Sequence, residues 1–210
     1  MARAYFAFHL EGLDHIPRSG PGLIACNHAS YLDPIANAYA VLRAGRRPRF
    51  LAKEELFRAP LLRWALPGLR QIPVRRGTGD TSALDLAAVA LRSGEVVVIY
   101  PEGTVTRRED GMPMEGKTGV VRLSLATGLP VIPMVSWGST PVWQKSGRGS
   151  LRPRRPVWVT AAPAIDVPGS GADAEDVDAI KRVTAEVMDR LTDLVVDLRA
   201  RYPERWTPDG

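Results

Sequence analysis

The feature of this 210-residue sequence that most limits its fold is a series of short apolar runs spaced along the chain. The runs are rich in Val, Ile and Leu, and their length is typical of buried strands. The predicted strands are residues 22–26, 49–52, 71–74, 95–100, 130–136 and 157–161.

Segments with helical periodicity lie between these runs. Residues 34–43 form one, with Asp33 as the expected N-cap and Pro34 at the first helical position. Residues 81–92 and 117–127 form two more, ended by glycines that suit a helix terminus. This alternation predicts a single α/β domain with a central, mostly parallel mixed sheet flanked by helices.

The C-terminal part of the chain predicts one long amphipathic helix over residues 173–201, with Asp173 as its cap. Its apolar residues recur at three- and four-residue steps, as expected for a helix that docks on a core. They are Val177, Ile180, Val183, Val187, Leu191, Leu194 and Leu198. No domain boundary is evident, so we predict one domain over residues 1–210.

The charge distribution indicates an anionic partner. Residues 1–172 carry a net charge of +9, whereas residues 173–210 carry −4, and 24 of the 28 basic residues are Arg. The planar guanidinium pairs well with phosphate, so a phosphorylated small molecule or an anionic membrane surface fits. A solvated basic surface is the alternative. No nucleic-acid-binding motif is present, and we predict no nucleic acid partner.

His28 and Asp33 are the first candidates for chemistry, in a turn after the first predicted strand. A neutral imidazole can accept a proton from a hydroxyl, and a carboxylate on its other nitrogen fixes the tautomer. The alternatives are that Asp33 only caps a helix and that His28 is an ordinary loop residue.

Three further segments carry polar groups where ligands of α/β sheets gather. Glu102 and Gly103 follow the most apolar strand, Arg75 and Arg76 follow the 71–74 strand, and Lys117 begins a predicted helix. Arginines and a helix N-terminus can bind phosphate. A plain strand-to-loop turn is the alternative for Glu102 and Gly103, and a solvated basic pair is the alternative for the two arginines.

Together and in this order, the segments resemble the lysophosphatidic acid acyltransferase family, formally the 1-acylglycerol-3-phosphate O-acyltransferases. The blocks that match are Asn-His-x4-Asp at residues 27–33, an apolar strand ending in Arg at 71–76, Pro-Glu-Gly-Thr at 101–104 and Val-Ile-Pro-x at 131–134. The resemblance spans residues 6–167, and within the family the sequence is most similar to the actinobacterial branch. Where many relatives have Arg-Ser after Pro-Glu-Gly-Thr, this chain has Val105 and Thr106, and we expect Arg107 to supply the missing charge.

The resemblance implies a glycerolipid acyltransferase-like fold and transfer of a fatty acyl group from an acyl-CoA or acyl carrier protein thioester. The implied acceptor is 1-acylglycerol 3-phosphate (lysophosphatidic acid), and the product is phosphatidic acid, for phospholipid biosynthesis. His28 is then the catalytic base, and Asp33 orients it. The residues implied in binding the acceptor are Arg76, Glu102, Gly103, Thr104, Arg107 and Lys117. No metal and no redox cofactor is implied.

The same chemistry on glycerol 3-phosphate, a lysophospholipid, a lyso-ornithine lipid or a glycolipid stays open. So does a non-catalytic phospholipid-binding module, although the intact pair of His28 and Asp33 disfavours it. An acyl-cysteine intermediate on Cys26 is a further, weaker alternative.

A lipid substrate requires a route to the membrane. We expect no signal peptide, because Arg3, His9 and Glu11 interrupt the N-terminal segment. We expect no transmembrane helix, because the uncharged stretch 128–143 is shorter than the ~20 apolar residues needed and is broken by prolines. Residues 53–66 instead predict a basic amphipathic helix that could lie in an anionic bilayer surface, or simply face the core. Residues 143–158 are a second basic candidate. We therefore expect a peripheral or monotopic protein at the cytoplasmic face of the cell membrane.

Overall fold

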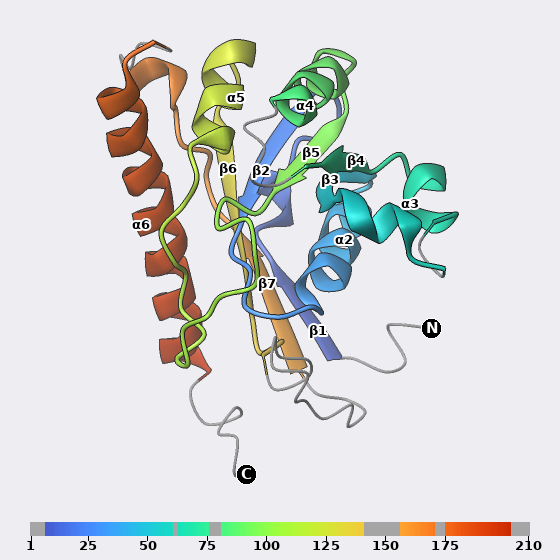
Figure 1. Cartoon of the computed structure of the whole chain (residues 1–210). Helices are drawn as coiled ribbons and strands as arrows, with labels where there is room; N and C mark the ends of the chain where they lie inside the picture. Colours follow the sequence, from blue (N-terminus) through green and yellow to red (C-terminus); the bar gives the residue numbers. More distant parts are fainter. Residues whose placement is uncertain (1–6, 61–62, 76–80, 141–155, 171–174, 203–210) are drawn as a thin grey trace.

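A computed structural model describes residues 7–60, 63–75, 81–140, 156–170 and 175–202 (Figure 1). It confirms the predicted α/β architecture: seven strands form one sheet in the order β1-β7-β6-β2-β5-β3-β4. Every strand pair is parallel except β6 with β7, which is antiparallel. The strands are β1 (Ala7–Glu11), β2 (Gly22–Cys26), β3 (Pro48–Lys53), β4 (Ile72–Val74), β5 (Val96–Ile99), β6 (Val131–Trp137) and β7 (Pro156–Ala161).

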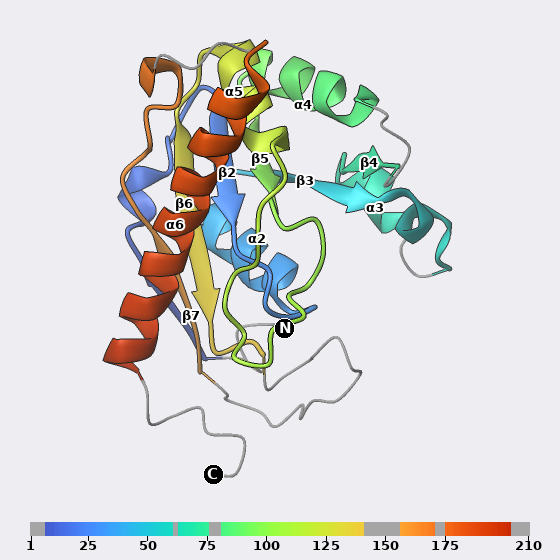
Figure 2. The same ribbon diagram turned by 60° about the vertical axis from the view of Figure 1, so that its left-hand side comes forward.

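Helices cover both faces of this sheet. α2 packs on one face, and α4, α5 and α6 lie on the other (Figures 1 and 2). The helices are α2 (Asp33–Arg43), α3 (Ala65–Gly68), α4 (Ser82–Arg92), α5 (Gly119–Thr127) and α6 (Val177–Arg201), with short 3-10 turns η1 (Leu13–His15), η2 (Glu54–Arg58) and η3 (Pro168–Ser170).

The core lies around the three central strands. All residues of β2 and β5 are buried, and so are the first six of β6. Because helices cover both faces, these strands are continuously apolar rather than alternating. α6 adds the residues that its periodicity predicted, including Ile180, Val187 and Leu198, whereas Val177 at its first position is half exposed.

Two predicted helix caps are corrected. Asp33 is not an N-cap: it is the first residue of α2, Leu32 holds the cap position, and no side chain caps this end. The Asp33 carboxylate is instead used inside the site described below. α6 begins later than predicted, because Asp176 accepts hydrogen bonds from the backbone N–H groups of Asp178 and Ala179. Asp173 lies outside the described residues.

The predicted amphipathic helix over residues 53–66 is wrong. Lys53 ends β3, the five residues of η2 follow, and α3 has only four residues. Proline explains the interruption: Ala59, before Pro60, is extended, which the proline ring favours. η2 and α3 project from the β3–β4 edge of the sheet (Figures 1 and 2).

The described residues contain no helix that has both the length and the apolar character to cross a membrane. The second basic candidate, residues 143–158, lies largely outside the described part of the chain.

Candidate active site

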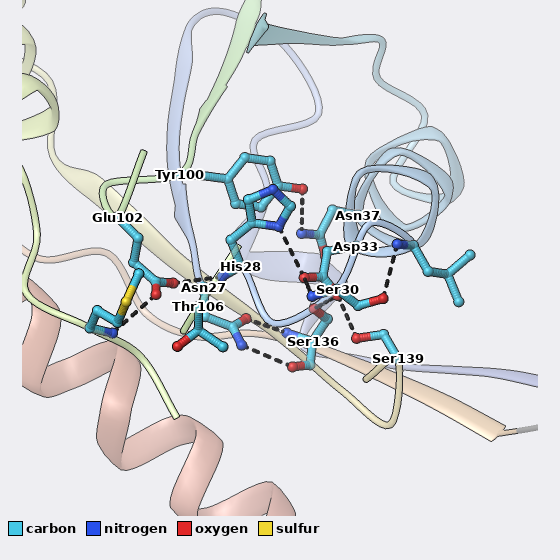
Figure 3. Close-up of polar contacts among 12 residues, drawn as sticks. Asn27, His28, Ser30, Asp33, Asn37, Tyr100, Glu102, Thr106, Ser136 and Ser139 are labelled. Atoms are coloured by element: carbon cyan, nitrogen blue, oxygen red, sulfur yellow. Dashed lines mark hydrogen bonds and ion pairs between the residues drawn. The ribbon is translucent and has the colours of Figure 1, made fainter. Parts of the chain in front are cut away.

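The carboxyl ends of β2, β5 and β6 meet at one edge of the sheet, where ligands of open α/β folds bind. His28 and Asp33 lie there, in the turn that joins β2 to α2. The Nδ1 of His28 is 3.2 Å from Oδ2 of Asp33 (Figure 3). The His28 side chain is 12% exposed and that of Asp33 is fully buried, so substrate can reach only the imidazole.

Four groups surround the Asp33 carboxylate. Oδ2 accepts the backbone N–H of Ser30 as well as the His28 contact. Oδ1 accepts the hydroxyls of Ser136, at 3.0 Å, and Ser139. Hydrogen bonds of this kind hold the carboxylate in one orientation. When Nδ1 of His28 carries the ring proton, it donates to Oδ2 of Asp33, and Nε2 then has the free lone pair that a general base needs.

The imidazole of His28 is also held by a ring. Tyr100, directly after β5, stacks on it with 4.3 Å between ring centroids and 25° between planes. The Tyr100 hydroxyl accepts a hydrogen bond from Asn37, one helical turn beyond Asp33 on α2. Burial raises the pKa of the Tyr100 hydroxyl well above 10, so it stays protonated. Tyr100 therefore fixes the plane of the imidazole.

Glu102 contacts the backbone of the site. It is 4% exposed; Oε1 accepts the N–H of His28 at 2.7 Å, and Oε2 accepts that of Met114 at 3.0 Å (Figure 3). Burial raises the pKa of Glu102 from 4.5 to about 7, although both N–H groups act to lower it.

Gly103 and Lys117 lie together beside this carboxylate. Gly103 has a φ of 68°, in the left-handed region that favours glycine. A side chain at this position would meet the Lys117 side chain at 3.2 Å. Lys117 is exposed and immediately precedes the N-terminus of α5, so its charge adds to the helix dipole.

The structure says less about the other three predicted binding residues. Thr104 is partly buried, and Arg107 is exposed with its backbone N–H on the sulfur of Met114. Arg76 lies outside the described residues. Its neighbour Arg75 is on the surface, paired with Glu54 at 2.7 Å.

Several residues hold the site in roles that the sequence did not predict, although Asn27 was recognised as part of the Asn-His-x4-Asp block. The Asn27 amide both donates to and accepts from the backbone of Ser136, which ties the ends of β2 and β6 together. Ser136 and Ser139 were not predicted to have a role. The available signal was their position: polar residues at and just beyond the end of an otherwise apolar buried strand.

Cys26 is not placed to act as a nucleophile. It is fully buried in β2, and burial, together with the Asp33 charge, raises the pKa of its thiol well above 9. A nucleophilic cysteine needs the opposite shift. Among the described residues, no three His, Cys, Asp or Glu side chains come together closely enough to hold a metal ion.

An α/β sheet with a His–Asp pair at its carboxyl edge suits acyl transfer to a hydroxyl. A family model described as Acyltransferase matches residues 7–137. The chain belongs to this acyltransferase family.

Two relatives of this chain are named for the lipid acceptors that they acylate. A chloroplastic 1-acyl-sn-glycerol-3-phosphate acyltransferase of Arabidopsis thaliana is 28% identical over 70% of this chain and 40% of its own length. A lyso-ornithine lipid O-acyltransferase of Pseudomonas aeruginosa is 31% identical over 62% of this chain and 48% of its own length. The chain thus spans less than half of either relative.

The fold has a solved counterpart in the crystal structure of PlsC, the 1-acyl-sn-glycerophosphate acyltransferase of Thermotoga maritima. The TM-score is 0.68 and the identity 25%, over 96% of this chain and 74% of that one.

Proposed function

We propose that this protein transfers a fatty acyl group from an acyl-CoA or acyl carrier protein thioester to the hydroxyl of a lysophospholipid. The observation that carries the proposal is the His28–Asp33 pair in a chain of the acyltransferase family. Nε2 of His28 removes the hydroxyl proton as the oxygen attacks the thioester carbonyl carbon. The tetrahedral intermediate then collapses, the carbon–sulfur bond breaks, and the thiolate leaves with the proton from His28. Asp33 stabilises the imidazolium between these steps.

The acceptor we propose is 1-acylglycerol 3-phosphate, which gives phosphatidic acid for phospholipid biosynthesis. Lys117, the N-terminus of α5 and Arg107 offer positive charge next to the loop that contacts His28. Gly103 would let a phosphate approach the backbone closely, and Thr104 and Arg76 complete the proposed set. The names of the Arabidopsis and Thermotoga relatives support this acceptor.

A lyso-ornithine lipid is the second candidate acceptor, because the relative named for that acceptor is 31% identical. It has no phosphate. An acceptor site that depends on Lys117 would favour the phosphorylated lipid, and one that does not would favour the lyso-ornithine lipid.

A panel of acceptors tests the proposal. The purified protein is incubated with palmitoyl-CoA and with 1-acylglycerol 3-phosphate, glycerol 3-phosphate, a lysophospholipid, a lyso-ornithine lipid or a lysoglycolipid, and the products are identified by mass spectrometry. We expect phosphatidic acid and stoichiometric release of CoA. Binding of the phospholipids without CoA release from any acceptor would mean a non-catalytic lipid-binding module.

We also propose that the protein works on an anionic membrane surface, at the cytoplasmic face. Six large apolar side chains on α2 and around α3 are between 42% and 77% exposed. They are Tyr31, Ile35, Leu42, Leu56, Trp64 and Leu69. α2 lies on the sheet face opposite α6 (Figure 1). Tyr31, the first of these exposed side chains, lies two residues before α2 and three residues after His28. The net positive charge of residues 1–172 complements anionic lipid.

A further inference from the structure

Glu102 is tied to the catalytic turn through the backbone. Its two carboxylate oxygens accept different N–H groups, from His28 and from Met114, which lie 86 residues apart in the chain. With 4% of the residue exposed, almost none of it faces solvent. Glu102 therefore bridges two segments of backbone instead of opening toward a bound molecule.

The loop that follows, residues 102–118, encloses His28 on its other side as well. The N–H of Thr106 donates to the carbonyl oxygen of His28 at 2.7 Å. The loop closes at its far end where the N–H of Lys117 donates to the carbonyl of Pro101 at 2.9 Å. Both the N–H and the C=O of His28 are thus bound by one loop, which also carries Arg107 and Lys117.

We propose that Glu102 is a positioning residue that holds the backbone of His28 in register with the acceptor-binding loop. The family resemblance implied that Glu102 binds the acceptor; in this proposal it does not. The inference rests on the proposed function, because it concerns the base of that reaction. Its physical basis is that a general base must lie within hydrogen-bond reach of the proton it removes, and small displacements cost large factors in rate.

Two substitutions separate positioning from binding. Glu102→Gln keeps one carbonyl oxygen for the His28 N–H but places an NH2 group opposite the Met114 N–H. Glu102→Ala removes both acceptors. Positioning predicts a graded fall in kcat, with Gln less affected than Ala, and an acceptor KM within about twofold of wild type. Glu109→Gln, an exposed glutamate of the same loop, is the matched control and should change neither constant.

Amide hydrogen exchange measured by NMR gives a readout that does not depend on catalysis. In Glu102→Ala, the amides of His28 and Met114 should exchange at least about tenfold faster, while amides in β2 and β5 keep their protection. In Glu102→Gln, Met114 should lose more protection than His28. Loss of protection throughout the sheet would overturn a local role, and so would unchanged exchange at His28.

The kinetic outcome that overturns the inference is a large rise in acceptor KM with kcat unchanged, because a direct ligand behaves in that way. If wild type transfers no acyl group to any acceptor, the proposed function fails. The amide exchange at His28 and Met114 then still decides whether Glu102 holds that backbone.

Discussion

Ser136 donates its hydroxyl to the carboxylate of Asp33 at 3.0 Å, although 103 residues separate the two in the chain. The contact joins the end of β6 to the start of α2 across the parallel pairing of β2 and β6. The orientation of Asp33, and through it that of His28, therefore depends on a residue of β6.

Removing the serine hydroxyls should therefore affect both stability and rate. Ser136→Ala and Ser139→Ala each leave the buried Asp33 with one donor fewer, and each should cost about 1–3 kcal/mol of unfolding free energy. The double variant should also lower kcat, because Asp33 orients His28 less firmly. Chemical denaturation and steady-state kinetics measure the two effects.

The matched control for these variants is Ser93→Ala, an exposed serine whose hydroxyl bonds to the carbonyl of Val89. It should change stability only slightly and leave kcat alone. A Ser136→Ala/Ser139→Ala protein with wild-type stability and turnover would contradict the role of these hydroxyls.

Glu102 should make stability depend on pH. Its folded pKa of about 7 lies above the ordinary 4.5, so the native state holds a proton that the unfolded chain releases in this range. The unfolding free energy should therefore fall as the pH rises from about 4.5 to 7. The loss from this group approaches about 3 kcal/mol above pH 7.

Denaturation of wild type and Glu102→Gln across this range isolates the effect, because the neighbouring charged side chains His28, Asp33 and Lys117 are the same in both proteins. As the pH rises, the unfolding free energy of wild type should fall relative to that of Glu102→Gln. Parallel stability curves would show that Glu102 ionises in the folded protein as it does in water.

Lys117 should contribute to acceptor binding. Lys117→Ala should raise the KM for 1-acylglycerol 3-phosphate about tenfold with a smaller change in kcat, and Lys117→Arg should restore part of the loss, because both cations pair with phosphate. Lys181→Ala, an exposed lysine on α6, is the control. An unchanged KM in Lys117→Ala would remove this residue from the acceptor site.

Membrane binding should depend on the exposed apolar side chains of α2 and α3. Ile35→Asp and Trp64→Asp should each weaken binding to vesicles of phosphatidylcholine mixed with phosphatidylglycerol about tenfold, since burying such a side chain contributes about 1.5–3 kcal/mol. Wild-type binding should weaken in high salt and with phosphatidylcholine alone. Vesicle sedimentation measures the effects of the substitutions, of salt and of lipid composition.

Val196→Asp provides the comparison, because Val196 is similarly exposed but lies on α6, across the sheet from α2. It should bind vesicles as wild type does. Equal loss in all three variants, or in none, would contradict a specific membrane-facing surface.

The strands of the centre could be predicted from the sequence because β2, β5 and β6 are covered on both faces and therefore continuously apolar. β1 was missed for the opposite reason. It lies at the edge of the sheet, its residues are only partly buried, and His9 and Glu11 interrupt its apolar pattern. Edge strands carry a weaker periodic signal than central ones.

The candidate site was predicted in part. Local spacing was enough to pair His28 with Asp33, because both belong to one turn. Ser136 and Ser139 join them only through strand pairing between distant segments, which no local pattern encodes. Glu102 was found by its motif, but its contacts with the backbone of His28 and Met114 depend on how distant segments pack, which the motif does not encode.

The turnover of His28→Ala tests the central claim most directly, with palmitoyl-CoA and 1-acylglycerol 3-phosphate as substrates. CoA release and phosphatidic acid are measured together, and circular dichroism confirms that the variant is folded. We expect kcat to fall by about 10²-fold or more, as for the loss of a positioned general base, with the acceptor KM near that of wild type. Turnover close to wild type in a folded His28→Ala protein would contradict the assignment of His28 as the base.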